Sequence, residues 1–455
     1  MNYIQMETNG QLKIEENCSN YLMVPSFLKE FNNCFTTIET IKGRKIYKFN
    51  GELAIGESEC ICENCQNKMH INNHCNVNLK HLPIGSFLSC IHFQKVQYYC
   101  SNCHLSKMQD VPFKVKNHRI TCELYNYTCD LLSYGYTNKQ VSELTGLGKN
   151  IVKDIDKERL MKLYTLGGEG KELIKPHEQA KFLGIDEFKL HNGHKYATHI
   201  IDLETGHILW IAKGKKKQVV YDFIEHVGSK WMENVIAIAC DMNSDFEKAF
   251  AEKCPHIKIV FDYFHIVKNF NDKVINEIRK EEQVRLAKEG DVVGYKLLKN
   301  SKYILTSSRE TLKKKDAQAE KNVETTHLFK ETINKYKNNY EKKYNEIIKN
   351  NELLFIADYV KEKLKLAYAQ DSEEKMMMEL VDIVGICFST KNKHLVWFGK
   401  LIVNHIDGII THAKYKISSG KIEGINNKIK TLRRQAYGYP DDEYFFLKLF
   451  DITRN

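Results

Sequence analysis

Short apolar runs separated by polar turns dominate the stretch from residue 182 to residue 261. The turns between the first three runs contain Asn192, Gly193 and Gly206, and such turns predict an antiparallel three-stranded meander. The run that ends at Cys240 is almost continuously apolar, which is typical of a strand buried at the centre of a sheet. The pattern predicts strands at 182–188, 196–203, 208–212, 235–240 and 257–261.

Aspartates lie at the edges of these apolar runs. Asp186 lies on the first predicted strand, Asp241 directly follows the fourth, and Asp262 ends the fifth, close to His265. A meander followed by alternating helices and strands is the element order of an RNase H-like fold, in which parallel neighbours would bring Asp186 and Asp241 together. Paired carboxylates can hold the divalent metal ions with which proteins cut and rejoin phosphodiester bonds. Asp262 is an alternative to Asp241 as the second ligand, or it orients DNA.

A third carboxylate, Glu423, follows a long Lys- and Glu-rich segment whose pattern is helical. We interpret this segment, residues 267–415, as an all-α insertion. Glu423 itself lies early in a basic amphipathic helix, where an acid either binds metal or only stabilises the helix N-terminus. The apolar stripe that is expected to pack on the sheet consists of Ile422, Ile425, Ile429 and Leu432. The polar residues expected to contact DNA are Asn426, Lys430, Arg433 and Arg434.

Two C-x-x-C pairs enclose a strand-like stretch in the first quarter of the chain. Four thiolates from two such pairs can bind one tetrahedral Zn²⁺ ion, which would stabilise a segment that has little core of its own. The predicted ligands are Cys62, Cys65, Cys100 and Cys103. The alternatives are ordinary buried thiols, or a different choice of ligands from the same stretch, which also holds Cys60, His70, His74, Cys75 and Cys90.

Helical patterns follow the second cysteine pair. Residues 118–133 have helical spacing, residues 137–144 form a short capped helix, and Gly146 and Gly148 separate that helix from another that begins at Lys149. Helix, glycine turn and helix are typical of a helix-turn-helix, whose second helix enters the major groove of DNA. The candidate recognition residues are Lys149, Asn150 and Lys153. Other small helical bundles share this pattern.

Composition limits the classes of function. With 68 basic and 58 acidic residues the net charge is +10, which permits a polyanionic partner. No apolar run approaches the ~18 to 20 residues of a membrane helix, so we expect a soluble cytoplasmic protein without a membrane partner. In that compartment cysteines act as thiols or metal ligands. His191, His194 and His199 are a second possible metal cluster, but their mixed turn and strand positions argue against it.

These patterns together predict a multidomain α+β protein. We expect an N-terminal segment without an assigned role (1–50), a zinc-binding β-knuckle domain (51–112), a helix-turn-helix domain (113–165), a linker (166–181), the first part of an RNase H-like α/β core (182–266), an all-α insertion (267–415) and the C-terminal helices of the core (416–455).

The order of these features resembles the DDE transposases of the ISL-three insertion-sequence family. The resemblance covers roughly residues 55 to 440, and its most specific part is the string around Glu423 followed by Tyr437-Gly438-Tyr439. The other strings that carry it are Leu82-Pro83-Ile84-Gly85, Gly184-Ile185-Asp186-Glu187, Asp241-Met242, Asp262-Tyr263-Phe264-His265 and Ser419-Gly420-Lys421-Ile422-Glu423-Gly424.

The resemblance implies a catalytic triad of Asp186, Asp241 and Glu423 that holds two Mg²⁺ or Mn²⁺ ions. It also implies a structural Zn²⁺ ion, binding of double-stranded DNA at terminal inverted repeats and at the target, cleavage, and transfer of a 3′-hydroxyl. A homo-oligomer associated with the nucleoid is expected on the same basis. A domesticated DNA-binding regulator of the same fold and a structure-selective nuclease are the alternative functions.

Overall fold

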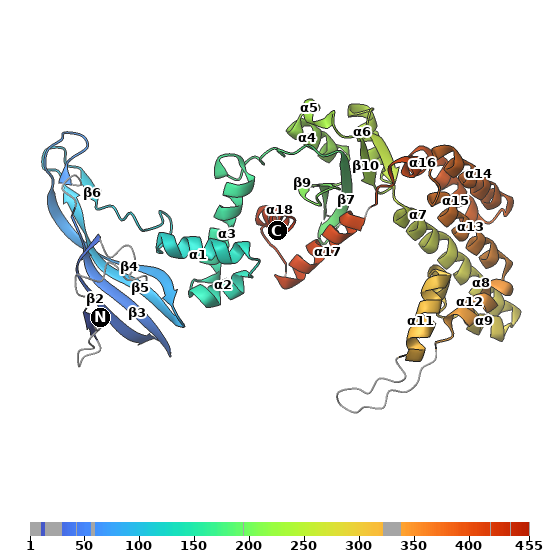
Figure 1. Ribbon diagram of the computed structural model, residues 1–455, viewed down its shortest axis with the longest axis horizontal. Helices are drawn as coiled ribbons and strands as arrows, with labels where there is room; N and C mark the ends of the chain where they lie inside the picture. The colour runs from blue at the N-terminus through green and yellow to red at the C-terminus, as the bar shows by residue number, and fades with distance from the viewer. Residues whose placement is uncertain are drawn as a thin grey trace. The chain divides into compact units, whose positions relative to one another are not determined.

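The computed structural model describes residues 11–13, 30–41, 43–55, 60–193, 195–321, 338–418, 420–436 and 438–454 (Figure 1). Most of the N-terminal segment, His194, Ser419 and Tyr437 lie outside these ranges. The chain forms two compact units, which are described separately. Unit 1 contains Met1–Ile174 and Glu443–Thr453, and unit 2 contains Lys175–Asp442. Among the described residues, no helix is long and apolar enough to cross a membrane.

Unit 1 begins with a six-stranded sheet. Its strands are β1 (Gln11–Lys13), β2 (Phe31–Ile41), β3 (Arg44–Leu53), β4 (His70–Ile84), β5 (Phe87–Tyr99) and β6 (Ser106–Met108). Their order is β1-β2-β3-β5-β4, and β6 pairs with β5. The parallel pairing of β3 with β5 joins the N-terminal segment to the sheet that carries the cysteine pairs. The boundary that we expected between residues 50 and 51 therefore falls inside β3.

Three helices follow this sheet in unit 1: α1 (Cys122–Ser133), α2 (Asn138–Thr145) and α3 (Lys149–Tyr164). Thr137 and Gln140 form a reciprocal capping box at the start of α2, and Gly146 ends it in a left-handed conformation with φ 69°. The three helices share a small apolar core of Ile120, Leu124, Leu131, Leu132, Val141, Leu147, Val152 and Ile155.

A fourth helix of this group comes from the end of the chain. Helix α18 (Asp442–Ile452) packs against α3 through buried charges rather than through apolar contacts alone. Asp156, which is fully buried, accepts bonds from Arg159 (2.9 Å), from the Tyr444 hydroxyl (2.6 Å) and from the Lys448 ammonium (3.0 Å). Arg159 also binds Asp451 at 2.6 Å. The expectation that residues 416–455 all belong to the core therefore does not hold for α18, because its polar partners lie on α3.

Unit 2 is built on a five-stranded sheet of order β11-β10-β7-β8-β9. Its strands are β7 (Phe182–His191), β8 (Lys195–Asp202), β9 (Ile208–Lys213), β10 (Ala237–Cys240) and β11 (Lys258–Phe261), so all five predicted strands are confirmed. β7, β8 and β9 form the predicted antiparallel meander, and β10 runs parallel to both β7 and β11. Helices α4 (Lys217–Val227), α5 (Ser229–Met232) and α6 (Ser244–Lys253) supply apolar residues to the core beneath this sheet.

The rest of unit 2 is helical, as the sequence predicted. After α7 (Tyr263–Phe270) and a π-helical turn (Asn271–Ile275) come α8 (Asn276–Glu289), α9 (Val292–Leu298), α10 (Lys302–Thr306), α11 (Arg309–Lys321), α12 (Tyr340–Lys349), α13 (Glu352–Tyr368), α14 (Glu373–Ser389), α15 (Lys393–Asn404), α16 (Ile406–Tyr415) and α17 (Gly420–Gln435). Their apolar residues are continuous with the core beneath the sheet. The helical insertion and the sheet thus share one core.

The contact between α3 and α18 generates the first prediction. Replacing Asp156 by Ala leaves Arg159 and Lys448 buried without one of their partners, and breaking a buried ion pair costs about 3 to 5 kcal/mol. We expect a loss of that size for the unfolding transition of unit 1, followed in the full chain by urea denaturation. The control Asp154→Ala removes an exposed aspartate from the same helix and should change stability by less than about 0.5 kcal/mol. Equal effects of the two substitutions would contradict the assignment.

Candidate active site

Three aspartates of unit 2 lie side by side on neighbouring parallel strands, at the level where β10 and β11 end. Cys240 on β10 pairs with Ile185 on β7 and with Phe261 on β11. The next residue along each of these parallel segments is an aspartate: Asp241, Asp186 and Asp262. Since neighbouring strands lie about 4.8 Å apart, this register brings the aspartates next to one another although they are distant in sequence.

Asp186 lies in a largely desolvated position. Its Oδ2 accepts a 2.7 Å hydrogen bond from the side-chain amide of Asn426, and its Oδ1 accepts one of 2.8 Å from the backbone N–H of Glu187. Burial raises the pKa of Asp186 and the charge of Asp241 adds to this rise, whereas the two hydrogen bonds and His265 oppose it. The site therefore holds a carboxylate in surroundings that favour a nearby cation.

Asp241 is more open to water than Asp186. Its side chain is about half exposed, its Oδ1 accepts a 2.7 Å bond from the backbone N–H of Met242, and the same oxygen lies 3.4 Å from Nδ1 of His265. Asp262 is different, because it is buried and caps α7 by accepting a 3.4 Å bond from the backbone N–H of Phe264. Its carboxylate is thus held at the start of a helix, while that of Asp241 keeps an exposed side.

A further carboxylate at this edge is Glu187. Its pKa is raised chiefly by burial, with added repulsion from Asp186 and Asp241, and Lys215 at 3.9 Å opposes that rise. Its Oε2 also accepts a 3.4 Å bond from Asn243. Side chains alternate between the two faces of a strand, so the sequence alone gives no sign of this electrostatic coupling between Glu187 and Asp186.

Helix α17 lies along β7, as Figure 1 shows within unit 2. The approach is close near Gly184, because a Cβ atom there would lie 2.7 Å from Cδ1 of Ile422. One turn further along the helix, Asn426 reaches Asp186. At the far end, Arg433 donates hydrogen bonds to the backbone carbonyls of Lys189 and Leu190. We expected Asn426 and Arg433 to contact DNA, but both side chains are bonded to β7.

Glu423 lies in the first turn of α17, three residues before Asn426, and its side chain is exposed. Residues three apart lie on the same helix face, so Glu423 is about one turn from the Asn426–Asp186 contact. Lys430 and Arg434 are also exposed on this helix.

The oxygen donors around Asp186 and Asp241 suit Mg²⁺ or Mn²⁺. One feature of the structure is consistent with a bound ion or its water ligands: Oδ1 of Asn426 is buried and has no hydrogen-bond partner. The carboxylates of Asp186, Asp241 and Glu423 do not all approach one another as closely as the cysteine ligands of unit 1. The residues present thus fit a divalent cation held between Asp186 and Asp241, with Asn426 beside it.

The four predicted cysteines of unit 1 form one cluster. The ligand atoms of these side chains all lie within 4.8 Å of one another, and no other such group of three or more potential ligands occurs among the described residues. The cluster consists of Cys62, Cys65, Cys100 and Cys103. Hydrogen bonds lower the pKa of Cys65 to about 6; the bond from the backbone of Asn67 has the largest effect, and the bond from the Asn102 side chain has the next largest. The cluster fits a structural zinc site. The alternative ligands Cys60, His70, His74, Cys75 and Cys90 are not in this group.

The candidate recognition residues lie at the start of α3. Lys149 and Asn150 are exposed in its first turn, and Gly148 precedes it without a side-chain cap. Lys153 is half-buried, with its ammonium 5.6 Å from the centre of the Tyr444 ring. Helix α18 therefore contacts the same helix that carries these three residues.

The histidines near β7 and β8 have separate surroundings. His191 bonds to Asp442 at 2.7 Å. His199 is fully buried and pairs across the strands with Asp186, and burial lowers its pKa to about 4. His194 lies outside the described residues. The described members thus do not share a metal ion.

Comparison with known proteins shows the family to which this chain is related. Residues 183–449 match the profile of the ISL-three group of DDE transposases. The transposase for insertion sequence element IS1001 from Bordetella parapertussis is 25% identical over 399 residues, which cover 86% of this chain and 87% of that protein. Transposases for insertion sequence element IS1557 from two strains of Mycobacterium tuberculosis are 27% identical over 85 residues, 19% of each chain. The chain is a transposase. It belongs to the ISL-three family of DDE transposases.

The cysteine cluster can be tested by metal content. Cys62→Ser removes a buried ligand, and we expect zinc in the purified protein to fall from about one ion per chain to near zero, as measured by elemental mass spectrometry. The control Cys75→Ser changes a thiol on β4 outside the cluster and should retain the metal. Equal zinc contents in the two variants would show that the cluster does not hold the ion.

The contact of Asn426 with Asp186 generates a prediction for metal binding. Asn426→Ala removes the donor that stabilises the Asp186 carboxylate, and loss of such a partner typically weakens metal binding 10-fold or more. We expect the affinity for Mn²⁺, measured by electron paramagnetic resonance, to fall about tenfold. Asn427→Ala alters the neighbouring exposed amide of the same helix and should leave the affinity unchanged. Similar affinities in both variants would assign Asn426 no part in the metal site.

Proposed function

We propose that the chain catalyses DNA strand cleavage and 3′-hydroxyl strand transfer at the ends of an insertion sequence, with Asp186, Asp241 and Glu423 as its catalytic carboxylates. The observation that carries this proposal is the parallel register that aligns Asp186 with Asp241 at the sheet edge. The strand order, a three-stranded meander followed by two parallel strands, supports an RNase H-like core. Membership of a transposase family supplies the substrate class.

The residues of this site would have distinct roles in the mechanism. Asp186 and Asp241 would hold two Mg²⁺ ions between them, and Glu423 would complete the set from α17. The bound ions supply Lewis-acid activation of the attacking oxygen and stabilisation of the leaving oxygen. Asn426 orients the Asp186 carboxylate through its 2.7 Å bond, and Nδ1 of His265 lies 3.4 Å from the carboxylate of Asp241.

Unit 1 would bind the terminal inverted repeats. The α2–Gly146–α3 arrangement supports a helix-turn-helix with Lys149 and Asn150 directed at base edges and phosphates. Its apolar core and the zinc cluster would hold these elements rigid. Such an enzyme works on paired ends, so a homo-oligomer at the nucleoid, in the cytoplasm, is part of the proposal.

The three carboxylates are tested together. Asp186→Asn, Asp241→Asn and Glu423→Gln each remove a metal-ligand charge while preserving shape, and we expect cleavage and joining of labelled element ends to fall below detection. Binding of the same ends, measured by electrophoretic mobility shift, should persist because the recognition residues lie in unit 1.

The matched control is Asp245→Asn, which alters an aspartate four residues after Asp241 in the first turn of α6. It should retain cleavage. Strand transfer that survives in all three carboxylate variants would refute the assignment. A wild-type protein that binds the ends and joins nothing would be a regulator, whereas cleavage without end preference would indicate a nuclease.

A further inference from the structure

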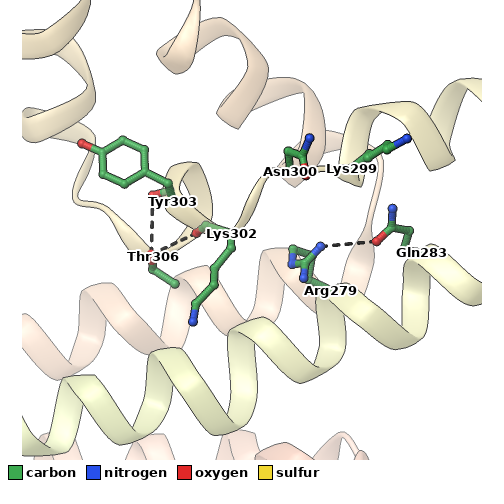
Figure 2. A pocket seen from close by; sticks show the side chains of 7 residues that line it. All are labelled: Arg279, Gln283, Lys299, Asn300, Lys302, Tyr303 and Thr306. Atoms are coloured by element: carbon green, nitrogen blue, oxygen red, sulfur yellow. Dashed lines mark hydrogen bonds between the residues drawn. The ribbon is translucent and has the colours of Figure 1, made fainter.

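The helical insertion contains an open, solvent-facing cavity away from the candidate active site, bordered by seven residues with polar or charged side chains. Its volume is about 760 Å³, and it is bordered by α8, by the loop after α9 and by α10. Figure 2 shows Arg279 and Gln283 on one helix, with Lys299, Asn300 and Lys302 contributed by the segment that passes over it. None of the residues that line this cavity is acidic.

Arg279 gives the cavity an uncompensated charge. Its guanidinium donates to Gln283 Oε1 at 3.3 Å, to the Leu298 carbonyl at 3.4 Å and to Asn276 Oδ1 at 3.2 Å, so every acceptor is neutral. Its Nε is buried without a partner. Within the part of the chain that the structure describes, no carboxylate lies within ion-pair distance of it. An anion bound beside this half-buried guanidinium would supply the charged acceptor that it lacks.

Nearby acids are engaged elsewhere. On α8, Glu277 pairs with Lys280 at 2.7 Å, and Glu282 pairs with Arg285 at 2.9 Å. Asp272 pairs with Lys302 at 3.2 Å, but both side chains are about half exposed, and exposed pairs contribute little and exchange easily. The acidic residues of this region therefore leave Arg279 uncompensated and hold Lys302 only weakly.

The charge extends well beyond the cavity. Residues 291–316 contain seven Lys and Arg residues and three acids, a net charge of +4 in a chain whose total is +10, and Arg309 and Lys313 are paired with Asp358 and Glu341. A single small anion would use only one or two of these cations, whereas a run of basic residues matches a polyanion. Tyr303, at the same cavity, is exposed and has the ammonium of Lys315 4.8 Å from the centre of its ring, which places a further cation beside the cavity.

We infer that this surface, centred on Arg279, Lys299 and Lys302, binds the phosphate backbone of DNA. The inference rests on the proposed function, because it takes DNA as the substrate, and it adds a second DNA contact on the helical insertion. The contact is independent of sequence, since it is made by Lys and Arg side chains to phosphates rather than to base edges.

Salt-dependent binding of the full-length protein to a long mixed-sequence duplex tests this contact. Each lost phosphate contact reduces the slope of log affinity against log salt by about 0.9. We expect a reduction of about two in Lys299→Gln/Lys302→Gln, which alters exposed side chains only, and of about one in Arg279→Gln. The control pair Lys375→Gln/Lys391→Gln removes the same charge from exposed positions on and after α14 and should keep the wild-type slope.

Unchanged slopes in the cavity variants, or an equal change in the control pair, would overturn the inference. A free-anion site would also overturn it: inorganic phosphate would then stabilise the wild type but not Arg279→Gln against thermal unfolding, with the DNA slope unaltered. Because the readout is binding, it is separate from the catalytic proposal. If the wild type transfers strands but the cavity variants keep the wild-type salt slope, only the proposed DNA contact is rejected. If the cavity variants have reduced slopes but the wild type transfers no strands, only the proposed catalysis is rejected.

Discussion

The close approach of α17 to β7 is the contact on which the candidate active site depends. It is possible because residue 184 is glycine: a Cβ atom there would lie 2.7 Å from Ile422 and 2.9 Å from Leu203. With the helix seated at that distance, Asn426 reaches Asp186 and Arg433 reaches the carbonyls further along the strand. Contacts near both ends of α17 and in its middle therefore hold the helix that carries Glu423 against the strand that carries Asp186. The helices between β11 and α17 in the sequence lead the chain back to this strand.

Chain topology links this arrangement to unit 1. The chain leaves unit 1 after Ile174, forms unit 2, and returns at Glu443 to add α18 to the N-terminal helices. Helix α18 follows α17 after a short segment, and it is held to α3 by buried charges. Unit 2 is thus tethered at both ends to elements of unit 1.

Much of the sheet could be predicted because its signals are local. Each strand is an apolar run between polar turns, and the parallel placement of Asp186 beside Asp241 followed from the order of elements. Two other features depend on partners far away in sequence. The buried bond between Asp156 and Tyr444 of α18 joins residues 288 positions apart in the sequence, and nothing in either segment alone specifies it. Similarly, the basic pattern of α17 suggested DNA contacts for Arg433, but its acceptors are carbonyls of β7.

Asn426 and Arg433 are both hydrogen-bonded to β7. Of the basic residues on α17 that we expected to contact DNA, Lys430 and Arg434 are exposed and form a small positive surface beside an acidic centre. If Asp186, Asp241 and Glu187 act as proposed, they repel phosphates until cations bind, and affinity for a DNA backbone would then come from elsewhere. The basic segment 291–316, with a net charge of +4, would supply part of that affinity within the same unit. Separating backbone affinity from the acidic centre would let the carboxylates bind metal without competing lysines or arginines, which is a physical reason for the helical insertion to be basic.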